Sequence, residues 1–260
     1  MNTVETAILE KTSLKTKSKE PVIEINNLKK SFGNQEVLKD VSLKLFNGEN
    51  LVVLGKSGSG KSVLIKCIVR LLIPDSGAIH VLGENMNALK SDELSELRKK
   101  IGFLFQSGAL YDSMTVKQNL EFPLRRIRKN LTEKEITEKI SEALENVGLA
   151  DALNKMPSQL SGGMRKRISL ARTIVVDPRI MLYDEPTTGL DPVTSDEISV
   201  LINAVRKRYK TSSIIITHDI ECARHTADRI LMLQDGAVYQ EGKLDQFEKS
   251  TDDVIKSFFK

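Results

Sequence analysis

Short runs of apolar residues alternate along the chain with longer segments in which apolar residues recur every three or four positions. The runs have the length of buried strands, and the longer segments have the spacing of amphipathic helices. Strands that alternate with helices are typical of a parallel sheet covered on both faces. We therefore expect an α/β fold with strands at Val22 to Ile25, Val41 to Leu45, Leu51 to Leu54, Ile101 to Phe105, Ile180 to Tyr183 and Ile214 to Ile216.

The first two runs lie on either side of the turn Phe32-Gly33-Asn34, which predicts a small antiparallel region near the N-terminus. The third run leads through a glycine-rich segment into a helix that we expect to stop at Pro74. One face of this helix is apolar, with Leu64, Ile65, Ile68 and Leu71 or Leu72. Another helix is expected before the Ile214 run. Its apolar face comprises Ile198, Leu201, Ile202 and Val205.

Between Phe105 and Ile180 the pattern becomes helical. Thr132 and Glu135 have the spacing of a capping box, and Gly148 stands where a helix would end. The apolar residues between them recur at helical spacing, at Ile136, Ile140, Leu144 and Val147. We expect residues 107–172 to form a helical insertion in the α/β core.

The composition is that of a folded protein. Of the 260 residues, 40% are hydrophobic and 28% are charged, and the net charge of +4 is too small to indicate nucleic acid or a membrane surface. No apolar stretch approaches the roughly 20 residues that cross a bilayer. Residues 1–20 are polar, so we expect them to form a flexible tail ahead of one domain, 21–260. The two cysteines, Cys67 and Cys222, favour packing over a disulfide or zinc site.

A phosphate-binding loop follows the Leu51 strand. The segment GKSGSGKS has the form G-x-x-x-x-G-K-[ST] and stands between a predicted strand and a predicted helix. Its glycines let successive N–H groups point at phosphate oxygens, the lysine reaches the β- and γ-phosphates, and the final hydroxyl binds Mg²⁺. The residues expected to bind the nucleotide are Gly55, Lys56, Ser57, Gly58, Ser59, Gly60, Lys61 and Ser62.

Two carboxylates end the Ile180 strand. Asp184 is placed to hold the metal, directly or through water, and Glu185 is the candidate for polarising the attacking water. An acidic pair at a strand end is also common in solvated loops, but the phosphate loop favours the functional interpretation.

A third candidate site is the start of a helix. Ser161 has the character of an N-cap, and Gly162 and Gly163 leave backbone N–H groups uncovered for an anion. Taken alone, this segment also fits a helix cap followed by a solvated basic turn, Arg165 to Arg167.

In order along the chain, GKSGSGKS, Gln106, LSGGM, MLYDEP, GLDP and THD resemble the ATP-binding subunit of ABC transporters. The resemblance extends from about Pro21 to the C-terminus and implies a P-loop NTPase core with a mixed sheet, with ATP and Mg²⁺ as cofactors. It further implies that Gln106 senses Mg²⁺, that Asp191 acts across a dimer and that His218 contacts the γ-phosphate. Phe32 stands where the family places an aromatic residue on adenine, most often tyrosine.

The resemblance also implies partners. ATP on one protomer's phosphate loop would be closed by Ser161, Gly162 and Gly163 of a second protomer, so a homodimer is expected. A separate integral membrane permease would receive the motion that hydrolysis releases. The expected location is therefore peripheral, on the cytoplasmic face of the inner membrane.

Three features indicate a subgroup of the family. They are Met164 in place of the usual glutamine, the stretch from Ser107 to Val116 after Gln106, and the stretch from Ser62 to Lys66 after Lys61. Together they resemble the Mla-type ATPases, which work with MCE-domain proteins to move phospholipids between bacterial membranes.

The alternatives are the ATPase of a solute importer, for example for amino acids, and more remotely a soluble ABC ATPase acting on ribosomes or nucleic acid. A P-loop kinase would have no use for LSGGM or Glu185. The basic run from Arg125 to Lys129 suits a solvated helix face better than a lipid-binding one.

Overall fold

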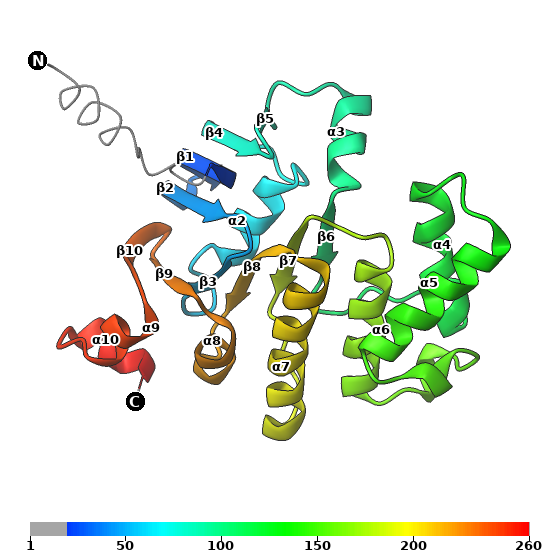
Figure 1. The fold of residues 1–260 in the computed structure, drawn as a ribbon. Helices are drawn as coiled ribbons and strands as arrows, with labels where there is room; N and C mark the ends of the chain where they lie inside the picture. Colours follow the sequence, from blue (N-terminus) through cyan, green and yellow to red (C-terminus); the bar gives the residue numbers. More distant parts are fainter. Residues whose placement is uncertain (1–19, 260) are drawn as a thin grey trace, which may run out of the picture.

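The computed structural model describes residues 20–259, so all but the last residue of the expected tail lies outside the described residues. The strands form one ten-stranded mixed sheet, in the order β5-β4-β1-β2-β10-β9-β3-β8-β7-β6 (Figure 1). This arrangement agrees with the α/β class and the mixed sheet expected from the sequence. None of the helices within residues 20–259 is long and apolar enough to span a bilayer.

One end of the sheet is antiparallel. It contains β1 (Pro21–Phe32), β2 (Gln35–Phe46), β4 (Ser76–Val81) and β5 (Glu84–Asn85). Strands β1 and β2 pair from Pro21↔Phe46 to Phe32↔Gln35, so the predicted turn is present, with Gly33 at a φ of 58°. Both strands are longer than the apolar runs that predicted them.

The other end is mainly parallel. It contains β3 (Asn50–Leu54), β6 (Ile101–Leu104), β7 (Ile180–Asp184), β8 (Ser212–Thr217), β9 (Arg229–Gln234) and β10 (Ala237–Gly242). Strands β9, β3, β8, β7 and β6 are parallel neighbours, whereas β10 is antiparallel to β9 and joins β2. The carboxyl ends of the five parallel strands therefore meet at one edge of the sheet.

The two faces of the sheet carry separate cores. Leu51 and Val53 of β3 pack into the cluster that includes α2 (Lys61–Ile68) and α3 (Ser91–Arg98). The alternate residues, Val52 and Leu54, pack on the opposite face, because successive strand side chains point to opposite sides. The helices of that opposite face are α6 (Gly162–Ile174), α7 (Pro192–Tyr209), α8 (Ile220–Thr226), α9 (Leu244–Glu248) and α10 (Asp253–Phe259).

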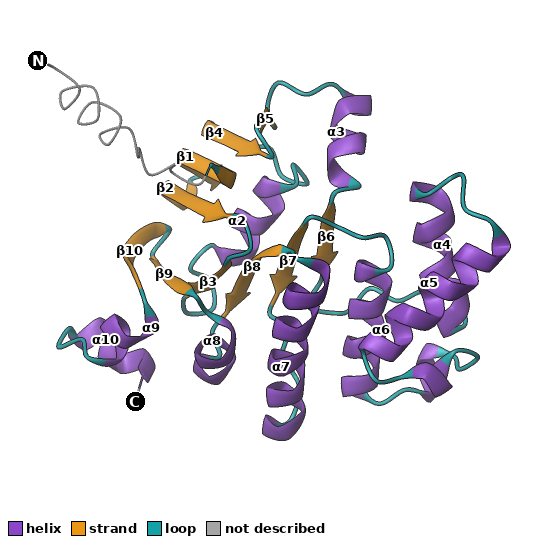
Figure 2. Cartoon of the chain, viewed as in Figure 1, coloured by secondary structure: helices purple, strands orange, loops and turns teal. Residues whose placement is uncertain are grey.

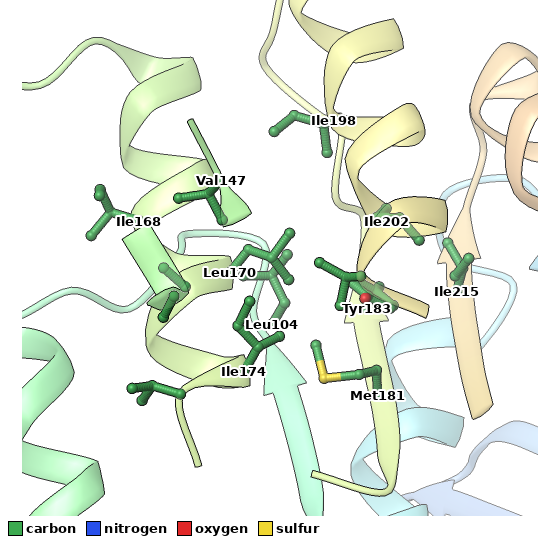
Figure 3. Packing of buried hydrophobic residues seen from close by; sticks show 14 of the residues in the cluster. Leu104, Val147, Ile168, Leu170, Ile174, Met181, Tyr183, Ile198, Ile202 and Ile215 are labelled. Carbon is green, nitrogen blue, oxygen red and sulfur yellow. The ribbon is translucent and has the colours of Figure 1, made fainter. Parts of the chain in front are cut away.

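Helices occupy the chain between β6 and β7. They are α4 (Val116–Ile127), α5 (Glu133–Asn146), the 3₁₀ turns η2 (Ala150–Ala152) and η3 (Pro157–Gln159), and α6, and α4 to α6 lie together beyond β6 (Figure 2). Thr132 and Glu135 form the predicted capping box of α5, which ends before Gly148 at a φ of 69°. Leu170 and Ile174 of α6 pack with Leu104 and Met181 of the sheet (Figure 3).

The predicted end of the helix after the phosphate loop is wrong. Helix α2 ends at Ile68 rather than at Pro74, because Arg70 adopts a left-handed conformation with a φ of 55°. The amide of Leu71 then bonds back to the carbonyl of Lys66 at 2.9 Å, which closes the helix, and Leu71 is left 55% exposed. The Arg70 guanidinium donates to the carbonyls of Met86 and Leu89. This tertiary contact is not visible in a periodic pattern.

Candidate functional site

The candidate site lies where the parallel strands end. The phosphate loop follows β3, Gln106 follows β6, Glu185 follows β7 and His218 follows β8. Segments that are far apart in the sequence thus meet around one cavity of about 290 Å³. The cavity is lined by Val37, Ser57, Gly58, Gly60, Lys61, Ser62, Val63, Gln106, Glu185 and His218.

The phosphate loop has a backbone that only glycine adopts without strain. Gly58 and Gly60 have φ values of 83° and 101°, in the left-handed region. A Cβ added at Gly60 would lie 2.8 Å from Leu38 Cδ2 and 2.9 Å from the Val37 carbonyl oxygen. The loop leads directly into the N-terminus of α2, whose free N–H groups favour anions. This cradle fits a nucleotide phosphate.

The ammonium of Lys61 lies inside the loop and is 5% exposed. It donates to the carbonyl oxygens of Gly55, at 2.7 Å, and Lys56, at 3.0 Å. It also lies 3.4 Å from Glu185 Oε1. The loop therefore holds the lysine charge in the lining of the cavity, beside the carboxylate expected to act on water.

Ser62 and Asp184 form the expected metal pair. The Ser62 hydroxyl donates to Asp184 Oδ1 over 3.1 Å. Burial raises the pKa of Asp184, although the Ser62 hydrogen bond acts in the opposite direction. A hydroxyl and a carboxylate at this separation are oxygen donors of the kind that Mg²⁺ prefers, and a cation between them would offset the burial of the negative charge. The donor set therefore fits Mg²⁺.

Glu185 is the most constrained residue of the site. It is 8% exposed and has a φ of 48°, which is uncommon for a residue with a side chain. Its Oε2 accepts hydrogen bonds from the Thr188 hydroxyl at 3.2 Å and from the His218 amide, and lies 2.8 Å from His218 Nδ1. The structure thus brings together three predicted residues, Lys61, Glu185 and His218.

Lys166 lies in the segment Arg165 to Arg167, for which a solvated basic turn was one of two interpretations of the sequence. It is 6% exposed, and its ammonium donates to the carbonyl of Gln106 at 2.5 Å and to that of Glu185 at 3.4 Å. Burial lowers the pKa of Lys166, and the nearby carboxylates of Asp184 and Glu185 partly oppose this effect. The helical period could have predicted the burial of Lys166, because this residue stands four positions before Leu170, on the buried side of α6.

Ser161 caps α6, as predicted, by accepting a hydrogen bond from the Met164 amide at 3.2 Å. Ser161 and Gly162 are exposed. Within residues 20–259, the residues that line the phosphate-loop cavity include neither of them nor Gly163. A Cβ on Gly163 would lie 2.6 Å from Thr194 Cγ2, so the glycine permits α6 and α7 to approach closely.

Asp191 has a local structural role. It caps α7 by accepting from the Thr194 amide at 3.0 Å and from the Thr194 hydroxyl at 2.6 Å. These hydrogen bonds lower the pKa of Asp191. Its expected contact across a dimer stays a prediction.

Phe32 ends β1 and is 47% exposed, so it is not a core residue. The ammonium of Lys30 lies 5.4 Å from the centre of its ring. Within the described residues, Phe32 is not among those that line the phosphate-loop cavity. Its role on adenine stays a prediction.

The fold and site together define a class of protein, a P-loop domain that binds ATP with Mg²⁺. This class requires a phosphate loop, a carboxylate pair at a strand end and parallel strands between helical layers. Here the loop follows β3 and the pair stands at the end of β7, in the parallel part of the sheet.

Residues 38–188, more than half of the chain, match the family model described as ABC transporter. The chain therefore belongs to the ABC transporter family, and the family implies ATP hydrolysis.

Three curated relatives are similar over most of the chain. The protein TRIGALACTOSYLDIACYLGLYCEROL 3, chloroplastic, of Arabidopsis thaliana is 39% identical, over 91% of this chain and 73% of its own length. The probable ribonucleotide transport ATP-binding protein mkl of Mycobacterium tuberculosis is 41% identical, over 91% and 66%. The methionine import ATP-binding protein MetN of Brucella abortus is 36% identical, over 85% and 60%. The chain thus spans less than two thirds of the length of the last two relatives.

A solved structure supports the fold directly. The dimeric post-hydrolysis state of the ATP-binding cassette MJ0796, bound to ADP and Pi, has a TM-score of 0.77 and 35% sequence identity. The match covers 85% of this chain and 98% of that one. The expected ABC ATPase fold is therefore confirmed.

Proposed function

We propose that this chain is the ATP-hydrolysing subunit of a transporter that moves phospholipid between bacterial membranes. The observation that carries the ATPase part is the group formed at the end of the parallel strands by the buried Lys61 and Glu185 and the exposed His218. The phospholipid part rests on the resemblance to the Mla-type ATPases of Met164, the stretch from Ser107 to Val116 and the stretch from Ser62 to Lys66. One relative also bears the name of a glycerolipid.

In the proposed mechanism, the phosphate loop and Lys61 would bind the β- and γ-phosphates, and Ser62, Asp184 and the side chain of Gln106 would hold Mg²⁺. When bound, Mg²⁺ neutralises charge on the transferring phosphate. The Glu185 carboxylate orients the attacking water and accepts its proton. His218 fixes that carboxylate from Nδ1, since the two groups are 2.8 Å apart.

A homodimer would complete the site. Ser161 and Gly162 are exposed at the N-terminus of α6, outside the cavity that contains Lys61, so they are free to meet the nucleotide of a second protomer. Exposed backbone N–H groups at a helix N-terminus suit a γ-phosphate. Loss of that phosphate on hydrolysis would remove the link between the protomers.

The surface after Gln106 is the proposed permease contact. Tyr111 and Phe122 are 42% and 40% exposed, and their rings meet edge to face at 5.5 Å. Arg172 lies 4.8 Å from the Tyr111 ring and donates to the Ala109 carbonyl. Exposed aromatic and arginine side chains are enriched in protein interfaces. The proposed location is the cytoplasmic face of the inner membrane, with an MCE-domain protein in the same complex.

Glu185→Gln tests the ATPase mechanism. The amide keeps the shape of the side chain but cannot accept the proton, so we expect kcat to fall about a hundredfold or more while ATP still binds. The measurements are phosphate release and equilibrium ATP binding. Asp92→Asn, on the exposed side of α3, is the control and should keep full activity. Rapid hydrolysis by Glu185→Gln would contradict the role of Glu185.

Isolation of the tagged chain from native membranes in mild detergent tests the cargo. A polytopic permease, an MCE-domain protein and bound phospholipid should co-purify. The second candidate is a solute importer, which the similarity to a methionine import protein favours. A permease with a soluble solute-binding protein would support that candidate, and ribosomes or repair factors would contradict both.

A further inference from the structure

Lys166 is a buried cation in a segment whose sequence also fits a solvated basic turn. It stands on the first turns of α6, four residues after Gly162. The neighbouring Arg165 is exposed, whereas Lys166 is 6% exposed. A lysine is rarely buried unless its ammonium is paired or hydrogen-bonded, so the contacts of this side chain explain its position.

Those contacts join three segments of the site. The ammonium donates to the carbonyl of Gln106, at 2.5 Å, just beyond the end of β6. It also donates to the carbonyl of Glu185, at 3.4 Å, just beyond the end of β7. The lysine itself belongs to the helix that Ser161 caps. One side chain thus ties the backbone of two site residues to α6.

The contact at Glu185 falls on strained backbone. Glu185 has a φ of 48°, in the left-handed region, which is unfavourable for a residue with a side chain. Its amide is held by the carbonyl of Ile216, at 2.9 Å, so Lys166 engages the other end of the same residue. Because the direction of the Glu185 side chain depends on this backbone conformation, a group that holds the carbonyl also aims the carboxylate.

We propose that Lys166 is a positioning residue for ATP hydrolysis, which fixes the backbone of Glu185 and Gln106 from the helix that carries Ser161. The inference rests on the proposed roles of Glu185 and Gln106. It makes α6 part of the hydrolytic site of its own protomer, in addition to the proposed role of its N-terminus towards a partner. A displacement of α6 would thereby alter the position of the Glu185 carboxylate.

The test is steady-state ATP hydrolysis by the purified full chain with Lys166→Met, which keeps the side-chain length and removes the ammonium. We expect kcat to fall about tenfold or more, while KM for Mg-ATP changes less than about threefold. Lys166→Arg, which restores a cationic donor, should recover most of the lost kcat. Lys134→Met, on the exposed face of α5, is the matched control and should hydrolyse ATP at the wild-type rate.

A kcat of Lys166→Met equal to that of the wild type would overturn the proposal. So would an equal loss of ATP binding and kcat that Lys166→Arg does not recover, because that result indicates a purely structural role. If Lys166→Met does not fold, Lys166→Gln retains a neutral donor and should show a kcat below that of Lys166→Arg. Glu185→Gln is measured in parallel. Inactive Glu185→Gln with fully active Lys166→Met refutes only this inference, whereas active Glu185→Gln refutes the proposed mechanism.

Discussion

Both cysteine side chains are buried, one on each face of the sheet. Cys67 packs with the α2 side and Cys222 with the α7 and α8 side. Burial raises the pKa of the Cys67 thiol to about 11 and that of the Cys222 thiol to about 12. The thiolate, which is the reactive form, is therefore suppressed at both positions throughout the neutral range.

We predict that neither thiol of the native protein reacts with an aromatic disulfide reagent at pH 8. Denaturation exposes both groups and returns each pKa towards the ordinary thiol value, so both should then react within minutes. The absorbance of the released thiolate measures the reaction, and Cys67→Ser identifies which group responds. Fast reaction of one thiol in the native protein would show that its side of the sheet opens locally.

At the scale of the element, the sequence predicted the strands and helix starts that follow from the local spacing of apolar and capping residues. The runs from Leu51 and from Ile180 are buried strands, and the capping box at Thr132 begins α5. It did not predict the end of α2, because the left-handed Arg70 is held by the distant carbonyls of Met86 and Leu89.

In the candidate site, too, the sequence predicted some residues and missed others. The strand ends predicted that Asp184 and Glu185 lie with the phosphate loop, since parallel strands share one carboxyl edge. Helical spacing indicates a buried position for Lys166, but the motifs did not predict its role, because its partners are backbone carbonyls, which no side-chain pattern records. The motifs also did not predict Thr188, whose hydroxyl reaches the Glu185 carboxylate because the chain turns after Glu185.

The side chain of Asn119 in α4 holds the backbone of the segment after Gln106, and its replacement measures how much this contact stabilises the fold. It is fully buried, and its amide group accepts from the Tyr111 amide at 2.8 Å and donates to the carbonyls of Tyr111, Met114 and Thr115. Asn119→Leu leaves the Tyr111 amide and the Met114 carbonyl without this partner, whereas the Tyr111 and Thr115 carbonyls still accept from the backbone amides of Met114 and Asn119. We expect a loss of about 2–4 kcal/mol in the free energy of unfolding.

Urea denaturation measures that loss. Asn130→Leu, the same change at an exposed position between α4 and α5, should cost less than about 0.5 kcal/mol. Equal stability of the two variants would mean that ordered water replaces the Asn119 contacts. In that case the segment after Gln106 would not depend on α4 for its conformation.

At the scale of the whole molecule, the chain has one phosphate loop and one LSGGM segment. The residues around Lys61 form a cavity to which, within residues 20–259, Ser161 does not contribute. In the proposed homodimer, a site that needs both segments would be assembled from two chains, and each dimer would contain two such sites. Defects in the two segments should therefore complement each other between protomers.

Lys61→Ala and Ser161→Arg test this arrangement, because each variant alone should be inactive. In a mixed dimer, one site combines both defects, while the other pairs an intact phosphate loop with an intact Ser161. If protomers exchange at random and the sites act independently, the mixture should regain about a quarter of the wild-type rate. Phosphate release is measured after co-refolding or co-expression, and the double variant Lys61→Ala/Ser161→Arg mixed with Lys61→Ala is the control, which contains no intact site. Recovery in the first mixture alone requires that Ser161 act on the nucleotide of the other protomer, whereas full activity of Ser161→Arg by itself would remove this segment from the site.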